Sequence, residues 1–440
     1  MPVSNEQKIL RILRLQVTDK PGYLAKIATI LGELEANIGE ISIVSQGPDY
    51  LVREISLQLK DEEHLKQIVT GIEKLDGVII DEVSDPVKLL HEGGKIGMKS
   101  RVPLNNINEM RKIYTPGVAQ ICKLIQAEPE MSKRYTGIAN TVAIITNGTA
   151  ILGLGQIGPV AGMPVMEGKS VLFEQLVGIS GIPILIDSTK ESEVIETIKS
   201  IATTFGAIQL EDIAAPECFE IEDKLQKALD IPVLHDDQHG TAIAVLAALI
   251  TIARRVDLNL NTSRVGLIGL GAAGTGITKL LKPFGVKEIL GADLRQDALD
   301  RLKSNGGTPT TIPDLMSKAD IVIATTGCPG LITPQMVRKG QVILALSNPD
   351  PEIIPELALE HGASFAADGR TINNALAFPG LFRGALTVGA KHFTHKMKIA
   401  AANAIADQTK AKDIVPSILD RTVHTEVAAA VERAWSEEHG

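Results

Sequence analysis

The chain has 440 residues, of which 44% are hydrophobic and 22% charged, so it can bury more than one sizeable core. Its 53 acidic and 44 basic side chains give a formal net charge of -9, and aromatic residues make up only 3%. This balance argues against a basic surface for nucleic acid or anionic membranes, and against stacking of bases on aromatic side chains.

Cysteine usage and the apolar runs bear on localisation. The cysteines are widely spaced and contain no CxxC pair: Cys122, Cys218 and Cys328. This pattern fits neither a disulfide framework nor a zinc site, and it favours a reducing compartment. Lys8, Arg11 and Arg14 interrupt the N-terminal apolar run, so no signal peptide is predicted. The uncharged run 238–253 is shorter than the ~20 residues of a membrane span. We therefore expect a cytoplasmic protein that binds neither membrane nor nucleic acid.

The first predicted unit spans residues 9–86 and has the order βαββαβ, which is typical of a ferredoxin-like fold. Strands are expected at 9–17, 37–44, 51–59 and 78–83, and helices at 23–35 and 61–75. The stretches DKPGYLAKIATIL and ANIGEISI resemble the ACT family of regulatory ligand-binding domains. A plain α+β unit that serves only for dimerisation is the alternative.

A glycine-rich, basic joint, Glu92–Lys95, leads into alternating strands and helices, which predict parallel sheets covered on both faces. Strands are expected at 142–146, 150–154, 184–187, 207–210, 233–235, 265–269, 288–293, 321–325 and 342–345. About 350 residues exceed a single core of this kind, so we expect two α/β domains. The boundaries are placed at 90–236 and 237–440, the second being a Rossmann-type doubly wound sheet with C-terminal helices.

A glycine-rich turn follows the apolar strand near residue 265 and opens a helix. It reads Gly269-Leu270-Gly271-Ala272-Ala273-Gly274, a GxGxxG pattern in the context that indicates dinucleotide binding. Gly269 permits the tight turn, Gly271 lets the backbone approach a pyrophosphate, and Gly274 allows close helix packing. Asp293 is placed to bind the ribose 2′-hydroxyl of NAD, although Arg295 could favour NADP. A structural turn without a cofactor is the alternative.

Four carboxylates follow two of the predicted strands. Glu211 and Asp212 follow strand 207–210, whereas Asp236 and Asp237 follow strand 233–235. Ligands of parallel α/β sheets collect at the carboxyl ends of the strands, so these side chains could converge in one cleft. Without a thiolate or a paired histidine, such a cluster suits Mg²⁺ or Mn²⁺. The alternative is that the carboxylates cap separate helices.

Six motifs occur in order between about residues 90 and 400. They are IYTPGVA (113–119), MPVMEGK (163–169), EDIAAPECF (211–219), VLHDDQHGTA (233–242), LSNP (346–349) and NNALAFPG (373–380). Together they closely resemble malic enzymes of the bacterial small-subunit type, to which the ACT-like segment adds a fused regulator. The resemblance implies oxidative decarboxylation of L-malate to pyruvate and CO₂, with reduction of NAD or NADP.

The resemblance also implies roles for single residues. Tyr114 is the expected acid that protonates the enolate, and Lys169 is the expected base. The implied metal ligands are Glu211, Asp212 and Asp237, with Asp236 as an electrostatic neighbour of Lys169. Asn348 and Asn374 are expected to contact the substrate or the nicotinamide.

Two further expectations concern the substrate site. A lysine acts as a base only when neutral, so burial or a nearby cation must lower the pKa of Lys169. The larger eukaryotic-type malic enzymes carry an arginine that grips a malate carboxylate where this chain has Thr149. Another residue must supply that charge here.

Other interpretations remain open. A metal-independent amino-acid dehydrogenase could share the Rossmann half and a lysine base, and a non-catalytic ligand-binding regulator could keep the folds without turnover. Free backbone N–H groups after the turn Asp19–Gly22 could bind a small carboxylate or amino acid as an effector. We also expect a homodimer or a higher homo-oligomer.

Overall fold

The chain divides into two compact units, Met1–Lys95 and Ile96–Gly440. The computed structural model describes residues 8–151 and 154–439. All of the residues expected to carry chemistry lie in the second unit.

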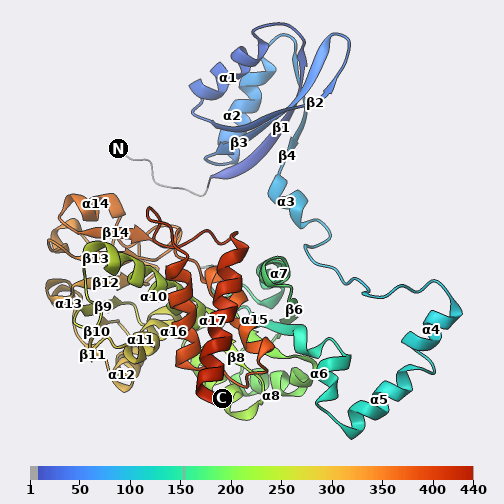
Figure 1. Cartoon of the computed structure of the whole chain (residues 1–440). Helices are drawn as coiled ribbons and strands as arrows, with labels where there is room; N and C mark the ends of the chain where they lie inside the picture. The colour runs from blue at the N-terminus through green and yellow to red at the C-terminus, as the bar shows by residue number, and fades with distance from the viewer. Residues whose placement is uncertain (1–7, 152–153, 440) are drawn as a thin grey trace. The chain divides into compact units, whose positions relative to one another are not determined.

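The first unit is an antiparallel sheet with the helices α1 and α2 and a short third helix, α3 (Figure 1). Its elements are β1 (Ile9–Thr18), α1 (Tyr23–Glu33), β2 (Asn37–Gln46), β3 (Tyr50–Leu59), α2 (Glu62–Glu73), β4 (Val78–Ser84) and the short helix α3 (Pro86–His91). The strand order β2-β3-β1-β4 confirms the predicted βαββαβ pattern. Alternate residues of β1, Leu13 and Leu15, are buried together with Ile27 and Leu31 of α1, because strands have a period of two and helices of about 3.6.

The second unit begins with a segment, 96–140, that we call the arm. It contains α4 (Ile107–Ile113), α5 (Val118–Ala127), α6 (Met131–Tyr135) and the 3-10 helix η1 (Ile138–Asn140). Every residue of the arm, all of which the structure describes, is exposed or only partly buried. Large apolar side chains are exposed along it, including Met98, Val102, Leu104, Ile107, Ile113 and Tyr114. Apolar surface of this extent typically marks an interaction site.

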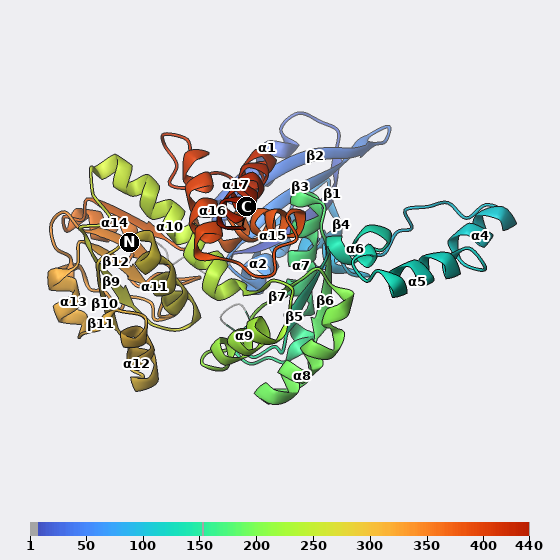
Figure 2. The ribbon, with the colours of Figure 1, turned by 60° about the horizontal axis from the view of Figure 1, so that its bottom comes forward.

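The first parallel sheet follows the arm and has the order β6-β5-β7-β8. Figure 2 shows β5, β6 and β7 with α7, α8 and α9 around them. Its elements are β5 (Thr141–Thr146), α7 (Pro159–Val177), β6 (Ser180–Leu185), α8 (Glu191–Ile201), η2 (Ala202–Thr204), β7 (Ala207–Leu210), α9 (Glu217–Ala228) and β8 (Val233–His235). The strand predicted at 150–154 is wrong, because Ile151 forms only an isolated bridge with Gly155, and 152–153 lie outside the described residues. Gly148 and Gly155 adopt positive φ angles of 70° and 77°, which turn the chain away from a ladder.

The second parallel sheet has the order β11-β10-β9-β12-β13-β14, which is the Rossmann arrangement that the sequence predicts. Its strands are β9 (Arg264–Ile268), β10 (Glu288–Ala292), β11 (Thr308–Pro309), β12 (Ile321–Ala324), β13 (Val342–Ala345) and β14 (Phe365–Asp368). The intervening helices are α11 (Ala272–Phe284), α12 (Gln296–Ser304), α13 (Ile312–Lys318), η3 (Pro334–Met336) and α14 (Pro355–Glu360). The edge strands β11 and β14 are additions to the prediction, and both are too short to show a clear period.

A long helix, α10 (Asp236–Val256), connects the two sheets and packs against α11 and α16. The chain ends with η4 (Asn374–Leu376), α15 (Phe378–Thr387), α16 (His395–Asp407) and α17 (Arg421–His439). With 21 residues, α10 is long and apolar enough to cross a membrane, but 78% of its most apolar stretch is buried inside the protein. Helix α10 is therefore a core helix, and its first turn lies at the carboxyl edge of the first sheet.

Candidate functional site

Four carboxylates converge at the carboxyl edge of the first sheet. Glu211 and Asp212 directly follow β7, while Asp236 and Asp237 form the first turn of α10 directly after β8. Because β7 and β8 are parallel neighbours, their carboxyl ends lie side by side. Glu211, Asp212 and Asp237 each offer an oxygen, and these oxygens lie within 4.8 Å of one another. The convergence predicted from the strand ends is thus present.

Hydrogen bonds orient this cluster. Gln209 Nε2 donates to Glu211 Oε2 at 2.7 Å, and the Asp212 N–H donates to Asp237 Oδ2 at 2.9 Å. Asp212 has a φ of 53°, a left-handed conformation that aspartate tolerates better than most residues. No role for Gln209 was predicted, although a polar residue inside the apolar strand AIQL was a signal for one.

Lys169 reaches the same cluster from the middle of α7. Its Nζ donates to Asp236 Oδ2 at 2.5 Å and lies 3.0 Å from Glu211 Oε1. The Nζ also lies 4.6 Å from the centre of the Phe378 ring, which in turn packs edge-on against Phe173, one helical turn beyond Lys169. The predicted proximity of Lys169 and Asp236 is therefore present, and Phe378 is an additional neighbour that lies inside the motif NNALAFPG.

The protein charges do not lower the pKa of Lys169. Burial opposes its charge, but Asp236 and Glu211 outweigh burial and raise the pKa of Lys169 above its usual range. Burial, together with the neighbouring carboxylates, raises the pKa of Glu211 well above its usual range, although Lys169 opposes this. Burial therefore does not make Lys169 neutral in the absence of a metal. Of the two causes considered for a neutral lysine, only a nearby cation remains.

The residues present fit a hard divalent cation. Three carboxylates supply oxygen donors at one point, which is the donor chemistry of Mg²⁺ and Mn²⁺ sites. The raised pKa of Glu211 reflects buried negative charge that a single ammonium group does not balance. Glu211, Asp212 and Asp237 would hold the cation, while Asp236 is committed to Lys169.

The first turn of α10 approaches the C-terminal part of the chain closely. A Cβ on Gly240 would lie 1.9 Å from Asp236 Oδ1 and 3.1 Å from the Cβ of Asn374. Only glycine leaves room for the Asp236 carboxylate at this position. Asn374, which begins η4, therefore lies close to the start of α10.

Tyr114 lies apart from this cluster. It ends α4 in the arm, and 70% of its surface is exposed. Within residues 8–151 and 154–439, Tyr114 makes no hydrogen bond, ion pair or ring contact with Lys169. The neighbours of Lys169 are Asp236, Glu211 and Phe378. A single chain therefore does not bring the expected acid and base together.

The glycine-rich turn has the geometry expected of a dinucleotide site. Gly269 has a φ of 89°, which opens the tight turn after β9. A Cβ on Gly274 would lie 2.0 Å from Gly269 O, so close packing excludes a side chain there. Gly271 faces open space, and Ala272 and Ala273 begin α11 directly after it. The N-terminus of α11 is thus accessible to a phosphate.

Asp293 and Arg295 border a cavity of about 720 Å³ that also contacts Gly269 and Gly271. The Asp293 carboxylate accepts hydrogen bonds from the N–H groups of Leu270, at 2.7 Å, and Arg295, at 2.8 Å. The Arg295 guanidinium donates to Ala215 O and lies near Asp297. Asp293 is therefore held against the glycine-rich turn, where a ribose would lie.

Asn348 and Thr149 lie in two loops of the second unit. Asn348 follows Ser347 and donates from Nδ2 to Gly369 O at 3.5 Å. Thr149 donates to Asn147 Oδ1 and accepts from the Ala214 N–H, so its hydroxyl ties together the loops beside the carboxylates.

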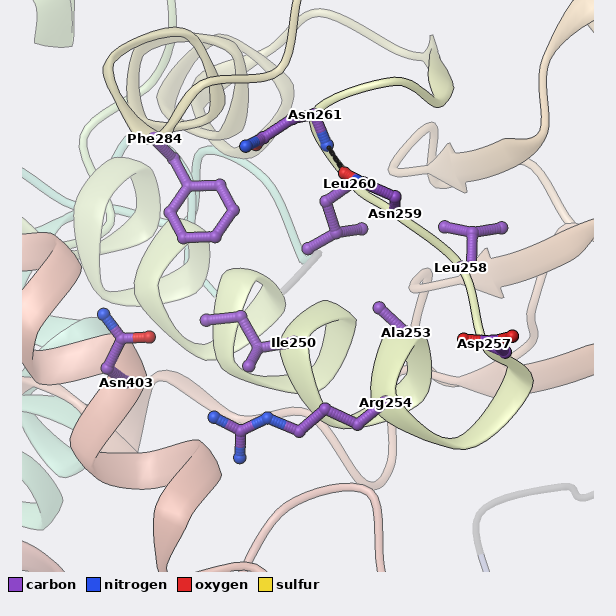
Figure 3. A pocket seen from close by; sticks show the side chains of 10 residues that line it. All are labelled: Ile250, Ala253, Arg254, Asp257, Leu258, Asn259, Leu260, Asn261, Phe284 and Asn403. Atoms are coloured by element: carbon purple, nitrogen blue, oxygen red, sulfur yellow. Dashed lines mark hydrogen bonds between the residues drawn. The ribbon is translucent and has the colours of Figure 1, made fainter.

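A second cavity, of about 420 Å³, lies at the other end of α10 (Figure 3). Ile250, Arg254, Phe284 and Asn403 line it, beside the loop in which the Asn261 N–H donates to Asn259 Oδ1. The two ends of a helix of this length are ~30 Å apart, so this cavity is separate from the carboxylate cluster.

Comparisons with known proteins agree with this arrangement. Family models match for the malic enzyme N-terminal domain over 94–195 and 189–226, and for the malic enzyme NAD binding domain over 366–435. An ACT domain matches over 9–80, and the NAD binding domain of D-isomer specific 2-hydroxyacid dehydrogenases matches over 249–330. The chain is 53% identical to NAD-dependent malic enzyme 1 of Bacillus subtilis, over 97% of this chain and 98% of that protein. The chain belongs to the malic enzyme family.

Other members of the family are also similar to this chain in sequence and structure. The NAD-dependent malic enzyme of Geobacillus stearothermophilus is 39% identical, over 96% of this chain and 93% of that protein. The crystal structure of malic enzyme from Pyrococcus horikoshii has a TM-score of 0.74 at 40% identity, covering 78% of this chain and 88% of that one. The NAD-dependent malic enzyme of Thermotoga maritima has a TM-score of 0.74 at 35% identity, covering 79% and 99%.

The metal ligand set predicts the effect of Asp237→Asn. The amide keeps an acceptor for the Asp212 N–H but removes one anionic oxygen donor. We expect the dissociation constant for Mn²⁺, measured by calorimetry, to rise by roughly 10–100-fold or more, since losing even a residue that supports a ligand costs that much. Asp257→Asn, at the far end of α10, is the matched control and should leave it unchanged. Equal Mn²⁺ affinity in Asp237→Asn and the wild type would remove Asp237 from the ligand set.

Proposed function

We propose that this malic enzyme family member catalyses metal-dependent oxidative decarboxylation of L-malate, giving pyruvate and CO₂ while NAD⁺ is reduced. The observation that supports this most is the contact of the Lys169 ammonium with Asp236 and Glu211, at an edge where three carboxylates can hold a cation. A metal-independent amino-acid dehydrogenase has no need of this carboxylate set, and a non-catalytic regulator has no need of the buried lysine.

The chain's own groups account for the proton transfers. Neutral Lys169 takes the proton of the C2 hydroxyl, and NAD⁺, when bound, would supply the acceptor for the hydride of C2. The C3–C4 bond of the resulting 2-oxo acid then breaks, CO₂ leaves, and Tyr114 gives a proton to C3. When bound, a divalent cation supplies positive charge that polarises the C2 oxygen and offsets the carboxylates that otherwise keep Lys169 protonated. Phe378 covers Lys169 and shields it from water.

Coenzyme binding involves the glycine-rich turn and Asp293. Gly271, Ala272, Ala273 and the start of α11 would hold the pyrophosphate, because the first N–H groups of a helix favour an anion. Asp293, held beside Gly269 by the Leu270 N–H, accepts the ribose 2′-hydroxyl and repels a 2′-phosphate. The guanidinium of Arg295 is engaged with Ala215 O, so it does not reverse this preference. We propose that Asn348 and Asn374 contact the nicotinamide and the substrate. We also propose that the enzyme is cytoplasmic.

The exposed arm favours a homodimer in which each active site is shared between chains. Tyr114 and Lys169 must come together in the reaction. Tyr114 is exposed, however, and no residue of the arm that carries it is buried. A second copy of this chain would cover the apolar arm and would receive Tyr114 next to its own Lys169. The arm's exposed Met98, Leu104 and Ile107 would then be buried at the interface.

The ACT domain is the proposed regulatory site. Gly22, with a φ of 94°, precedes α1, and among the described residues no side chain caps the first turn of this helix. Its N–H groups are open to a small carboxylate or amino acid. An effector that prefers one arrangement of paired ACT domains would shift the catalytic unit by its differential affinity.

Product analysis tests the reaction directly. With Mn²⁺, L-malate and NAD⁺, the protein should form NADH, CO₂ and pyruvate in equal amounts, and kcat/KM should be lower with NADP⁺. EDTA should stop the reaction and added Mn²⁺ should restore it. NADH formation that resists EDTA would favour the amino-acid dehydrogenase, and absence of any NADH formation would favour the regulator.

The shared active site predicts complementation between two inactive variants. Lys169→Ala and Tyr114→Phe should each lower kcat by about 10²–10⁴-fold. When the two variants are coexpressed, half of the dimers are mixed and each mixed dimer has one intact site, so about a quarter of the wild-type activity should return. Activity that stays at the level of the single variants would show that both residues act within one chain.

The ACT domain predicts the result of truncation. A chain that begins at Lys88 should retain malate oxidation, since none of the candidate catalytic residues lies before this point. It should lose any change in activity that amino acids or small organic acids produce in the full chain, and calorimetry should detect those compounds only with the full chain. An effector response that survives truncation would place the regulatory site in the second unit.

A further inference from the structure

A buried network of polar side chains connects helix α16 to α10 and α9. Lys398, in α16, is 6% exposed, and its Nζ lies 3.1 Å from His239 Nδ1. The other ring nitrogen, His239 Nε2, lies 3.0 Å from Glu222 Oε2. All three side chains are buried, and none of them is among the candidate catalytic or metal-binding residues.

Glu222 connects this network of side chains to the first turn of α10. Its Oε1 accepts the N–H of His235 at 2.8 Å, and its Oε2 accepts from Gln238 Nε2 at 3.0 Å. These two partners flank Asp236 and Asp237 in the sequence. The His235 ring also lies near the pair, with its Nε2 3.4 Å from Asp237 Oδ2. Glu222 therefore binds the backbone N–H of His235 before the aspartate pair and the side-chain amide of Gln238 after it.

The charges of the linked side chains Lys398, His239 and Glu222 are balanced. Burial opposes the Glu222 charge, but His239 and Lys398 outweigh it and lower the pKa of Glu222 to about 2. The Lys398 ammonium has only donors, so His239 Nδ1 must accept its hydrogen bond. A neutral ring that accepts from Lys398 at Nδ1 must donate to Glu222 from Nε2. One anion and one cation are thus bridged by a neutral ring with a single tautomer.

We propose that Lys398 is a positioning residue, which acts through His239 and Glu222 to hold the first turn of α10 so that Asp237 faces the metal. This inference rests on the proposed metal-dependent function. Partners that orient metal ligands from outside the coordination sphere contribute strongly to metal affinity. Without the Lys398 cation, Glu222 remains buried and uncompensated, and the groups that it holds on either side of Asp236 and Asp237 loosen.

Mn²⁺ binding to the full-length protein, measured by electron paramagnetic resonance after removal of metal with EDTA, tests this role. Lys398→Met keeps much of the side-chain volume and removes the charge. We expect it to raise the Mn²⁺ dissociation constant by about 10–100-fold. His239→Leu, which breaks the same link, should have a similar effect. His239→Gln should stay within about threefold of the wild type, because its amide keeps one acceptor and one donor.

The controls separate positioning from general damage. Lys396→Met changes a lysine of the same helix that is 62% exposed, and should leave the Mn²⁺ affinity unchanged. The affinity for NAD⁺, measured by calorimetry, should be the same in every variant. If Lys398→Met does not fold, the pair His239→Leu and His239→Gln decides the question alone.

Two results would overturn the inference. One is a wild-type Mn²⁺ affinity in Lys398→Met or in His239→Leu. The other is an equal loss of affinity in His239→Gln and His239→Leu, which would mean that the ring acts by its shape and not by linking two charges. If the wild-type protein itself binds no Mn²⁺, the proposed metal-dependent function fails together with this inference. If the wild type binds Mn²⁺ and the variants bind it equally well, only this inference fails.

Discussion

Like-charge repulsion at the carboxyl edge of the first sheet is the constraint that the rest of the site has to meet. Glu211, Asp212, Asp236 and Asp237 converge there with one ammonium group, that of Lys169, among them. Unit charges about 4 Å apart interact by on the order of 1–4 kcal/mol, depending on how well the surroundings screen them. The protein supplies donors such as Gln209 Nε2 and the Asp212 N–H, but it leaves an excess of negative charge. A divalent cation is the natural complement to that excess.

The close packing around α10 connects this cluster to the coenzyme domain. Gly240 leaves room for the Asp236 carboxylate, and Gly276 of α11 lets the two helices approach until a Cβ would lie 2.2 Å from Gln238 O. The helix whose first turn carries the aspartates therefore packs directly on the helix that follows the dinucleotide turn. Phe378 closes the site from the C-terminal side by covering Lys169. Substrate, metal and nicotinamide can then meet at one place, although the residues come from widely separated parts of the chain.

Local patterns in the sequence predict much of this arrangement. The strand ends at 210 and 235 predict the meeting of Glu211 with Asp237, because parallel strands present their carboxyl ends at one edge. The glycine spacing likewise predicts the turn at Gly269. The strand expected at 150–154 is wrong because glycines there favour turns over a ladder. Lys398 and His239 are 159 positions apart in the sequence, so no local sequence pattern predicts their contact. The motif YTPGVA likewise does not predict that Tyr114 is exposed, because the exposure of Tyr114 depends on which chain covers the arm.

The central claim is that Glu211, Asp212 and Asp237 together hold one divalent cation. Diffraction from crystals grown with Mn²⁺, recorded at a wavelength where manganese scatters anomalously, tests this claim most directly. The account predicts a single strong anomalous peak in each chain, within coordination distance of one carboxylate oxygen from each of these three residues, with Asp236 still bonded to Lys169. A peak elsewhere, or no peak at this cluster under conditions in which the enzyme turns over, would contradict it.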